Sequence, residues 1–364
     1  TNANNVAVGY LAGYAVTTGI RNTLIGTNAG DALTVGVQNV ALGREALGAD
    51  TKGNNSVAIG NSALRVQNFT TATDAFNTAV GDQAGIAVTT GLRNTLIGGF
   101  SGDALTDADY NVAVGSHSLS SDTLGSKSTA LGYTALFSQN FTTATDSFNV
   151  AVGYETGVSL TTGTKNTFVG SLAGDGTDDG AHNTAVGYQA LSVNCGDSNT
   201  ALGFQAGASI TGGKNTMIGD RAGDATTSGG GNVIIGTTCD ASAADTSNSI
   251  VMGEGVAGVG ANNFTFGNGG TDSNIAFGAT SITAPSDERY KEEITTSTAG
   301  LSFINDLRPV TFKWRKEKDV PSDHPTYVEG SDKRVMESNG EINHGFIAQE
   351  VKAVIDNHSE IKDG

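Results

Sequence analysis

Residues 5–9 read NVAVG and residues 22–26 read NTLIG, and this five-residue phrase decides the fold of the chain. It consists of a polar residue, usually Asn, then three mostly apolar or Thr positions, then Gly. The phrase recurs seventeen times up to Gly278, and most copies lie 17 residues apart. A fixed period of this length is typical of a solenoid, in which each repeat forms one turn.

A longer period is superimposed on the short one. The steps between closing glycines run 17, 17, 17 and 21 residues, so a unit of 72 residues is repeated. Residues 67–76 read QNFTTATDAF and return at 139–148 as QNFTTATDSF. These segments belong to the longest step, and we expect them to form protruding loops that contact a receptor. The candidate contact residues are Phe69, Phe76, Phe141 and Phe148.

The phrase itself predicts the type of solenoid. Alternate side chains of a strand point in opposite directions, so the first and third central positions share one face. The second position, most often Ala, lies on the other. We expect the first face to fill a narrow interior and the Ala face to lie against a neighbouring chain. Short strands with Gly at every corner predict a mainly β fold, a parallel β-roll or β-helix.

The composition divides the chain near residue 285. Residues 1–285 carry 9 Lys+Arg and 21 Asp+Glu, whereas residues 286–364 carry 11 and 16. Stacked rungs need every backbone N–H donor, which explains why the first part holds no proline before its last residue. The second part has the apolar spacing of a helix near 301–307, a strand near 310–314 and a helix near 351–355. It is predicted to be a small α+β domain.

Several classes of function and structure are disfavoured. The net charge of -17 argues against nucleic acid and anionic membranes as partners, and no apolar run is long enough for membrane insertion. Cys195 and Cys239 lie more than two rungs apart, which indicates buried thiols and no disulfide framework. The histidines form no metal-ligand spacing, and the repeated Gly-Asp turns, which could bind cations, are more typical of plain turn chemistry, so we expect no metal and no cofactor. The chain starts inside the repeat pattern without Met, as a fragment of a longer protein does.

A single rod of such rungs would bury too little apolar surface, which predicts an obligate oligomer. Residues 55–60, NSVAIG, resemble the head repeats of trimeric autotransporter adhesins, which form parallel β-rolls in threes. The similarity covers residues 4–278. It implies that this chain forms a homotrimer.

Three motifs in the second part carry another resemblance. They are SDERYK at 286–291, LRPVTF at 307–312 and GFIAQEV at 345–351. Their order resembles the intramolecular chaperone domain of phage tail spikes and fibres, peptidase family S74. Domains of that family usually continue into further C-terminal helices, so the domain is expected to be incomplete at Gly364.

In that family the Ser and Lys of the S-D-x-x-x-K motif cut the chain just before the Ser. Carried over, Ser286 is the nucleophile, Lys291 is the base, and Pro285-Ser286 is the bond that is cut once per molecule. A Lys acts as a base only when burial or nearby positive charge lowers its pKa. His344, beside the third motif, is the candidate for a third group near this dyad.

A chaperone suits such a rod, because near-identical rungs let three chains pair out of step. The sequence therefore predicts a trimeric segment of a phage tail fibre or spike. It would belong to the virion, be extracellular, and bind a host-cell surface receptor, with a glycan among the candidates. One alternative is a trimeric adhesin on a bacterial cell surface. A second is a tail spike that degrades polysaccharide.

Overall fold

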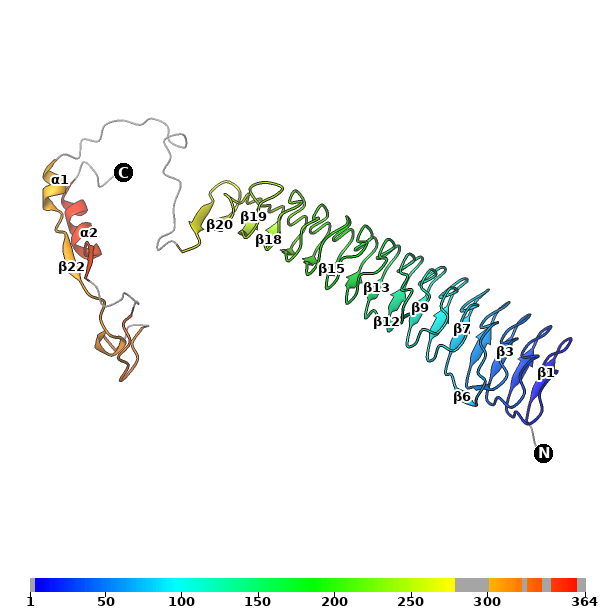
Figure 1. Ribbon diagram of the computed structural model, residues 1–364. Coiled ribbons are helices and arrows are strands. Elements are labelled where there is room, and N and C mark those ends of the chain that lie inside the picture. The colour runs from blue at the N-terminus through cyan, green and yellow to red at the C-terminus, as the bar shows by residue number, and fades with distance from the viewer. Residues whose placement is uncertain (1–3, 279–300, 323–325, 336–341, 359–364) are drawn as a thin grey trace. The chain divides into compact units, whose positions relative to one another are not determined.

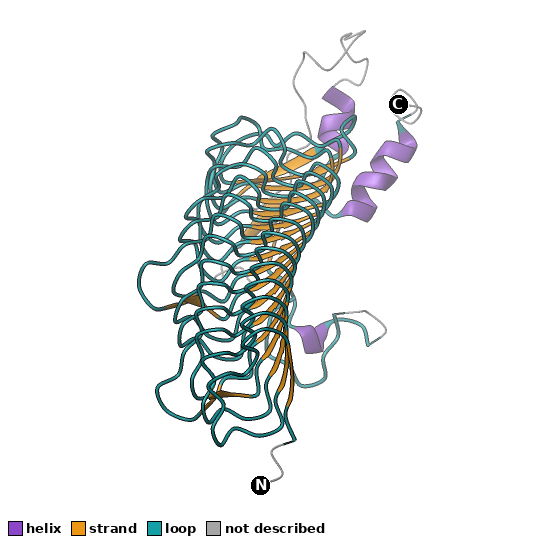
Figure 2. Ribbon diagram, turned by 90° about the vertical axis from the view of Figure 1, so that its right-hand side faces the viewer, coloured by secondary structure: helices purple, strands orange, loops and turns teal. Residues whose placement is uncertain are grey.

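The computed structural model describes residues 4–278, 301–322, 326–335 and 342–358. The chain divides into two compact units, residues 1–285 and residues 286–364. The first unit is a parallel β-solenoid, in which short strands stack one above the next along a rod (Figures 1 and 2). This confirms the predicted fold class of the repeat region.

Seventeen strands form one sheet, and two pairs of two-residue strands lie outside it. The sheet strands are β1 (Val6–Val8), β2 (Thr23–Ile25), β3 (Val40–Leu42), β5 (Val57–Ile59), β7 (Thr78–Val80), β8 (Thr95–Ile97), β9 (Val112–Val114), β11 (Thr129–Leu131), β13 (Val150–Val152), β14 (Thr167–Val169), β15 (Thr184–Val186), β16 (Thr200–Leu202), β17 (Thr216–Ile218), β18 (Val233–Thr237), β19 (Ile250–Glu254), β20 (Asn263–Gly267) and β21 (Ser273–Ala276). The two small pairs are β4 (Gly53–Asn54) with β6 (Thr73–Asp74), and β10 (Gly125–Ser126) with β12 (Thr145–Asp146).

The last copy of the phrase is not a rung. Strands β1 to β20 pair in parallel, but β21 pairs with β20 in the antiparallel direction, with Phe264 opposite Ile275. A parallel return needs a crossover of a dozen residues or more, and the connection here has only enough residues for a hairpin. The prediction of seventeen stacked rungs was therefore wrong at this end of the rod.

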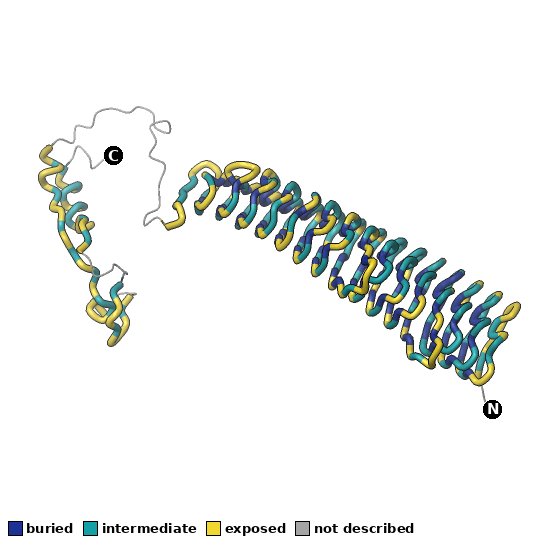
Figure 3. Tube along the Cα trace, in the orientation of Figure 1, coloured by how far each residue is buried: buried dark blue, intermediate teal, exposed yellow. Residues whose placement is uncertain are grey.

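The sequence interpretation also placed the wrong face inside. Ala58, Ala79 and Leu96, at the second position of consecutive rungs, are fully buried within a single chain and lie in register. Figure 3 shows this buried line running along the interior. The first and third positions point outward instead. The Ala face is thus the core of each rod, and it is not available for a neighbouring chain.

The interior takes small residues because the turns also fill it. Where the strand carries a large residue, the turn that follows carries Gly. A Cβ on Gly102 would lie 2.7 Å from Leu96, and one on Gly174 would lie 2.6 Å from Phe168. Where the strand carries Ala, the turn supplies Leu in some rungs, as Leu64 follows Ala58. In others, as with Gly85 after Ala79, side chains of the adjacent rungs fill the space, since a Cβ on Gly85 would lie 2.6 Å from Leu96 and 3.1 Å from Leu64. The strand, the turn and the adjacent rungs together thus fill the interior to the density of protein interiors.

The Asn that opens each phrase forms a buried ladder. The backbone N–H of Asn94 donates to Oδ1 of Asn77, and Nδ2 of Asn94 donates to the carbonyl of Ala108. The same pair of bonds recurs at Asn111, one rung further on. Each side chain thus satisfies backbone groups that would otherwise be buried without a partner.

The second unit contains α1 (Leu301–Asp306), β22 (Val310–Phe312), the 3₁₀ helix η2 (Glu317–Asp319), β23 (Asn343–Gly345) and α2 (Ala348–Asn357). Strands β22 and β23 form an antiparallel pair. None of the described residues of this unit is buried. The described residues of a single chain therefore provide no apolar core here.

Candidate functional site

The second and third motifs of the C-terminal unit meet in space. Strand β22 comes from the LRPVTF motif, and β23 directly precedes the FIAQEV residues. In the pair, Val310 lies opposite Gly345 and Thr311 lies opposite His344. His344 is exposed on this strand. Sequence motifs more than thirty residues apart are thus joined into one structural feature.

An ion pair links the same two motifs. The guanidinium of Arg308 donates from Nη2 to Oε1 of Glu350 at 2.5 Å and from Nε to Oε2 at 2.9 Å. This is the two-pronged geometry in which Arg binds a carboxylate most strongly. The hydrogen bond from Arg308 lowers the pKa of Glu350 below its usual value. The pair fixes the first turn of α2 beside the start of β22.

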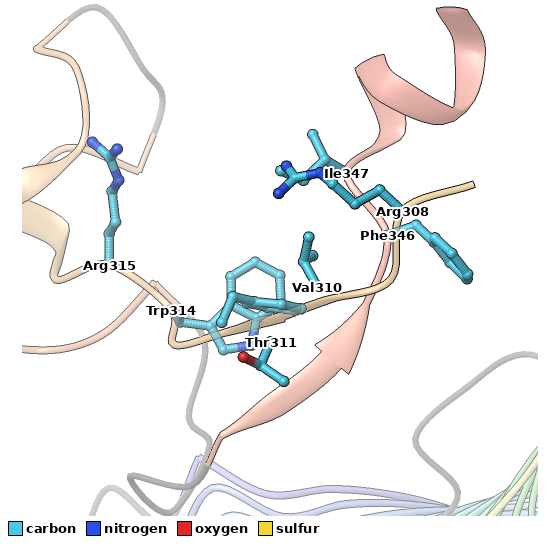
Figure 4. Close-up of a pocket in the computed structure, with 8 residues that line it drawn as sticks. Arg308, Val310, Thr311, Trp314, Arg315, Phe346 and Ile347 are labelled. Carbon is cyan, nitrogen blue, oxygen red and sulfur yellow. The ribbon is translucent and has the colours of Figure 1, made fainter. Parts of the chain in front are cut away.

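Beside this pair lies an open depression with a volume of about 570 Å³. Val310 and Thr311 point to opposite sides of β22, and Trp314 and Ile347 lie close by (Figure 4). Its lining residues are Arg308, Val310, Thr311, Phe312, Trp314, Arg315, Phe346 and Ile347. Phe346 and Ile347 are 52% and 40% exposed, which is unusual for large apolar side chains at a structured position.

Ser286, Lys291 and Pro285 lie outside the described residues. The dyad and the bond that it would cut therefore stay predictions from the resemblance. His344 is placed on β23, but its distance to the dyad is equally a prediction.

The structure separates the receptor-contact candidates into two kinds. Phe69 and Phe141 are only 5% and 7% exposed, at the roots of the two longer connections. Phe76 and Phe148 are 50% and 48% exposed, at the outer corners of the same segments. These connections carry β6 and β12, and they bulge from the side of the stack (Figures 1 and 2). Phe76 and Phe148 are the ones accessible to a partner.

A buried carboxylate anchors each bulge, which the sequence reasoning missed. Asp122 accepts hydrogen bonds from the backbone N–H groups of Gly125 and Phe141 and from Nε2 of Gln139. Burial raises the pKa of Asp122, and these hydrogen bonds oppose the rise. Asp50 does the same for the first bulge. The sequence did contain a sign of these anchors, since Asp50 and Gln67 recur 72 residues later as Asp122 and Gln139.

The comparisons with known proteins agree with the C-terminal motifs. Residues 286–360 match the family Peptidase S74, described as chaperone of endosialidase. No curated protein and no solved structure matches the chain. The C-terminal unit is therefore a peptidase S74 chaperone domain, and a parallel β-solenoid precedes it. Among the described helices, none is long and apolar enough to cross a bilayer.

The Arg308–Glu350 pair gives a testable prediction about assembly. Replacing either residue by Ala should lower the yield of assembled protein several-fold, because the two motifs lose their link. Both side chains are exposed, so water and salt screen the pair, and we expect its effect on assembly to exceed its effect on the stability of the single chain. The exchange R308E/E350R should restore part of the yield, measured by size-exclusion chromatography. A loss of the same size in K352A would contradict a specific role for the pair.

Proposed function

We propose that the chain is a segment of a trimeric phage tail fibre or spike that attaches to a host-cell surface. Its C-terminal domain directs assembly of three chains and then cuts itself off between Pro285 and Ser286. The observation that carries this proposal is an S74 chaperone domain placed directly after a parallel solenoid with an apolar outer stripe. The virion is the location that follows from it.

The outer stripe supports association of several rods. The third central position is apolar in every copy of the phrase, and it points outward along the parallel strands, so that one chain leaves an apolar line along its sheet. Its more exposed members are Val8, Leu42, Ile97, Leu131, Val169, Leu202 and Met252, with exposed fractions from 36% to 58%. Burying such a line stabilises an assembly by about 25 cal/mol per Å². The number three comes from the resemblance to the adhesin heads.

The chaperone domain supports the same conclusion independently. Its described residues include no buried side chain, and Leu301, Phe346 and Ile347 are exposed. A domain of this size folds stably only if it buries apolar surface against something. Copies of the same domain supply that surface, and they would also hold the three rods in common register. Cleavage afterwards would leave a rod that unfolds slowly, because its folding aid is gone.

Two glutamates on the outer stripe test the trimer. I97E/L131E should abolish the trimer, because three copies of each charge would meet in a desolvated contact. The control T71E/T143E adds the same charge on exposed loop residues and should stay trimeric. Multi-angle light scattering of both variants measures the mass. A full-strength I97E/L131E trimer would show that the sheet face is not the interface.

Attachment requires a separate experiment. The labelled full chain should adsorb to some strains in a panel of encapsulated and acapsular bacteria. Release of oligosaccharide from the capsule would instead favour the polysaccharide-degrading spike. A chain that stays uncut after folding would favour the bacterial surface adhesin, whose rod has no need of a removable chaperone.

A further inference from the structure

One corner of the solenoid carries most of the positive charge of the repeat region. The residue just before each ladder Asn or Ser occupies the same place in every rung, and we call this set the corner column. Residues 1–285 contain nine Lys and Arg, and five of them lie in the column. These five are Arg21, Arg93, Lys127, Lys165 and Lys214. No Asp or Glu occupies it, although residues 1–285 contain 21 acidic residues.

The column is a regular, outward-pointing structure. Arg93, Tyr110 and Lys127 share the left-handed backbone conformation, with φ values of 57°, 60° and 63°, and all three residues are exposed. Their backbone N–H groups donate to the carbonyls of Ala75, Leu92 and Asp109 on the preceding rungs. Successive column residues therefore stack at the rung spacing, at the corner that leads into each strand.

Aromatic residues alternate with the basic ones in the middle of the column. The order along the rod is Phe76, Arg93, Tyr110, Lys127, Phe148, Lys165 and His182. The Arg93 guanidinium lies 5.9 Å from the Phe76 ring and 5.4 Å from the Tyr110 ring, and Lys127 Nζ lies 5.2 Å from the Phe148 ring. All seven side chains are exposed. Cation–π contacts between rungs thus hold the side chains in an ordered array.

Most of the positive charges of the column are not paired with neighbouring carboxylates. Lys127 pairs with Asp146 at 2.5 Å, but both side chains are exposed, and an exposed pair of this kind is weak enough for an acid group of a ligand to replace the carboxylate. Within the described ranges, Arg93 and Lys165 form no ion pair with a carboxylate, and Arg93 Nη1 donates to the hydroxyl of Tyr110 at 3.0 Å. A concentration of unpaired cations on an otherwise acidic rod is a selective site for a negatively charged partner.

We propose that the corner column binds an acidic polysaccharide that lies along the rod. Arg93, Lys127 and Lys165 occupy alternate rungs, which places the cations about 10 Å apart. Acid groups on every second sugar of an extended glycan match this spacing. Arg and Lys bind the acid groups, and the rings of Tyr110 and Phe148 stack on the sugars between them. This inference rests on the proposed attachment function and names its receptor class.

Hyaluronan is a suitable probe, since it carries one carboxylate on every second sugar. The full chain should bind hyaluronan oligosaccharides in a salt-dependent way and should not bind neutral dextran, as measured by isothermal titration calorimetry. R93Q/K165Q should weaken the affinity at least about tenfold, because two charge-assisted contacts are lost. The control R44Q/R221Q removes the same charge outside the column and should bind as the wild type does.

Variants are compared only after light scattering shows the wild-type mass. Y110A should also weaken hyaluronan binding, because the stacking ring is lost while the charge is unchanged. Equal losses in R93Q/K165Q and R44Q/R221Q, or no hyaluronan binding at all, would overturn the proposal. Tighter binding to an oligothymidylate than to hyaluronan would also overturn it, since the partner would then be a nucleic acid.

Cell adsorption separates this inference from the attachment proposal. If the wild type adsorbs to encapsulated bacteria and R93Q/K165Q adsorbs equally well, the fibre attaches through another surface and the column assignment falls. If the wild type binds hyaluronan through the column but adsorbs to no strain, the glycan-binding site is supported and the proposed attachment function is contradicted. Reduced adsorption of R93Q/K165Q together with its reduced hyaluronan affinity supports both.

Discussion

Folded wild-type protein is expected to yield a fragment that begins with Ser286, whereas S286A should yield none. The Ser hydroxyl is the group that would attack the carbonyl of Pro285, so its removal leaves no nucleophile. K291A should slow cleavage by about 10²–10⁴-fold, the usual contribution of a general base. Mass spectrometry of the purified chains measures both effects.

The cleavage variants should still assemble, because the dyad serves the cut and the other motifs serve folding. Light scattering should give S286A and K291A a trimer mass with the chaperone domain attached. S302A and K352A change the same residue types at exposed positions and should cleave normally. If K291A cuts at the wild-type rate, or the wild type stays whole, the assignment of Ser286 and Lys291 fails. If the His344 ring assists the dyad, the cleavage rate of H344A should lie between that of the wild type and that of K291A.

A79E should destroy the solenoid itself. Ala79 is fully buried between Ala58 and Leu96 in the stack, so a glutamate there places an unpaired charge in the interior of one chain. An unpaired buried ion costs several kcal/mol, a large fraction of the 5–15 kcal/mol that stabilises a typical domain. We expect aggregation, loss of the β signal in circular dichroism and rapid proteolysis near residue 79.

The comparison with I97E/L131E separates the two faces of the sheet. Those substitutions lie on the outer stripe and should affect assembly, whereas A79E should affect the fold of each chain. T71E, on an exposed loop of the same rung, is the matched control and should behave as the wild type. A soluble, folded A79E monomer would contradict the interior position of Ala79 and restore the Ala face as the contact between chains.

The solenoid architecture of the repeat region and the family of the C-terminal domain could both be predicted from the sequence. The repeated phrase located the parallel strands of the main sheet to within a residue or two, because Gly is required at each corner, but it did not predict the two-residue strands β4, β6, β10 and β12. Gly81 has φ 141°, and a Cβ there would lie 2.4 Å from the carbonyl oxygen of Gly98 on the next rung. The need for Gly at each corner appears in the sequence as a regularly spaced glycine, so it can be recognised without a structure. The S74 motifs were likewise readable, and the family match covers residues 286–360.

The tertiary structure alone decided which face of each strand is enclosed. The two faces of a strand are equivalent in an alternating pattern, and the side on which the connection returns determines the interior. Ala58 in the strand and Leu64 in the turn are both fully buried. Where the strand carries Leu96, the turn carries Gly102, and a Cβ there would lie 2.7 Å from Leu96. The same winding aligns Arg93, Tyr110 and Lys127, which are far apart in the sequence, into one column. Long-range stacking brings such residues together, and no local pattern reports it.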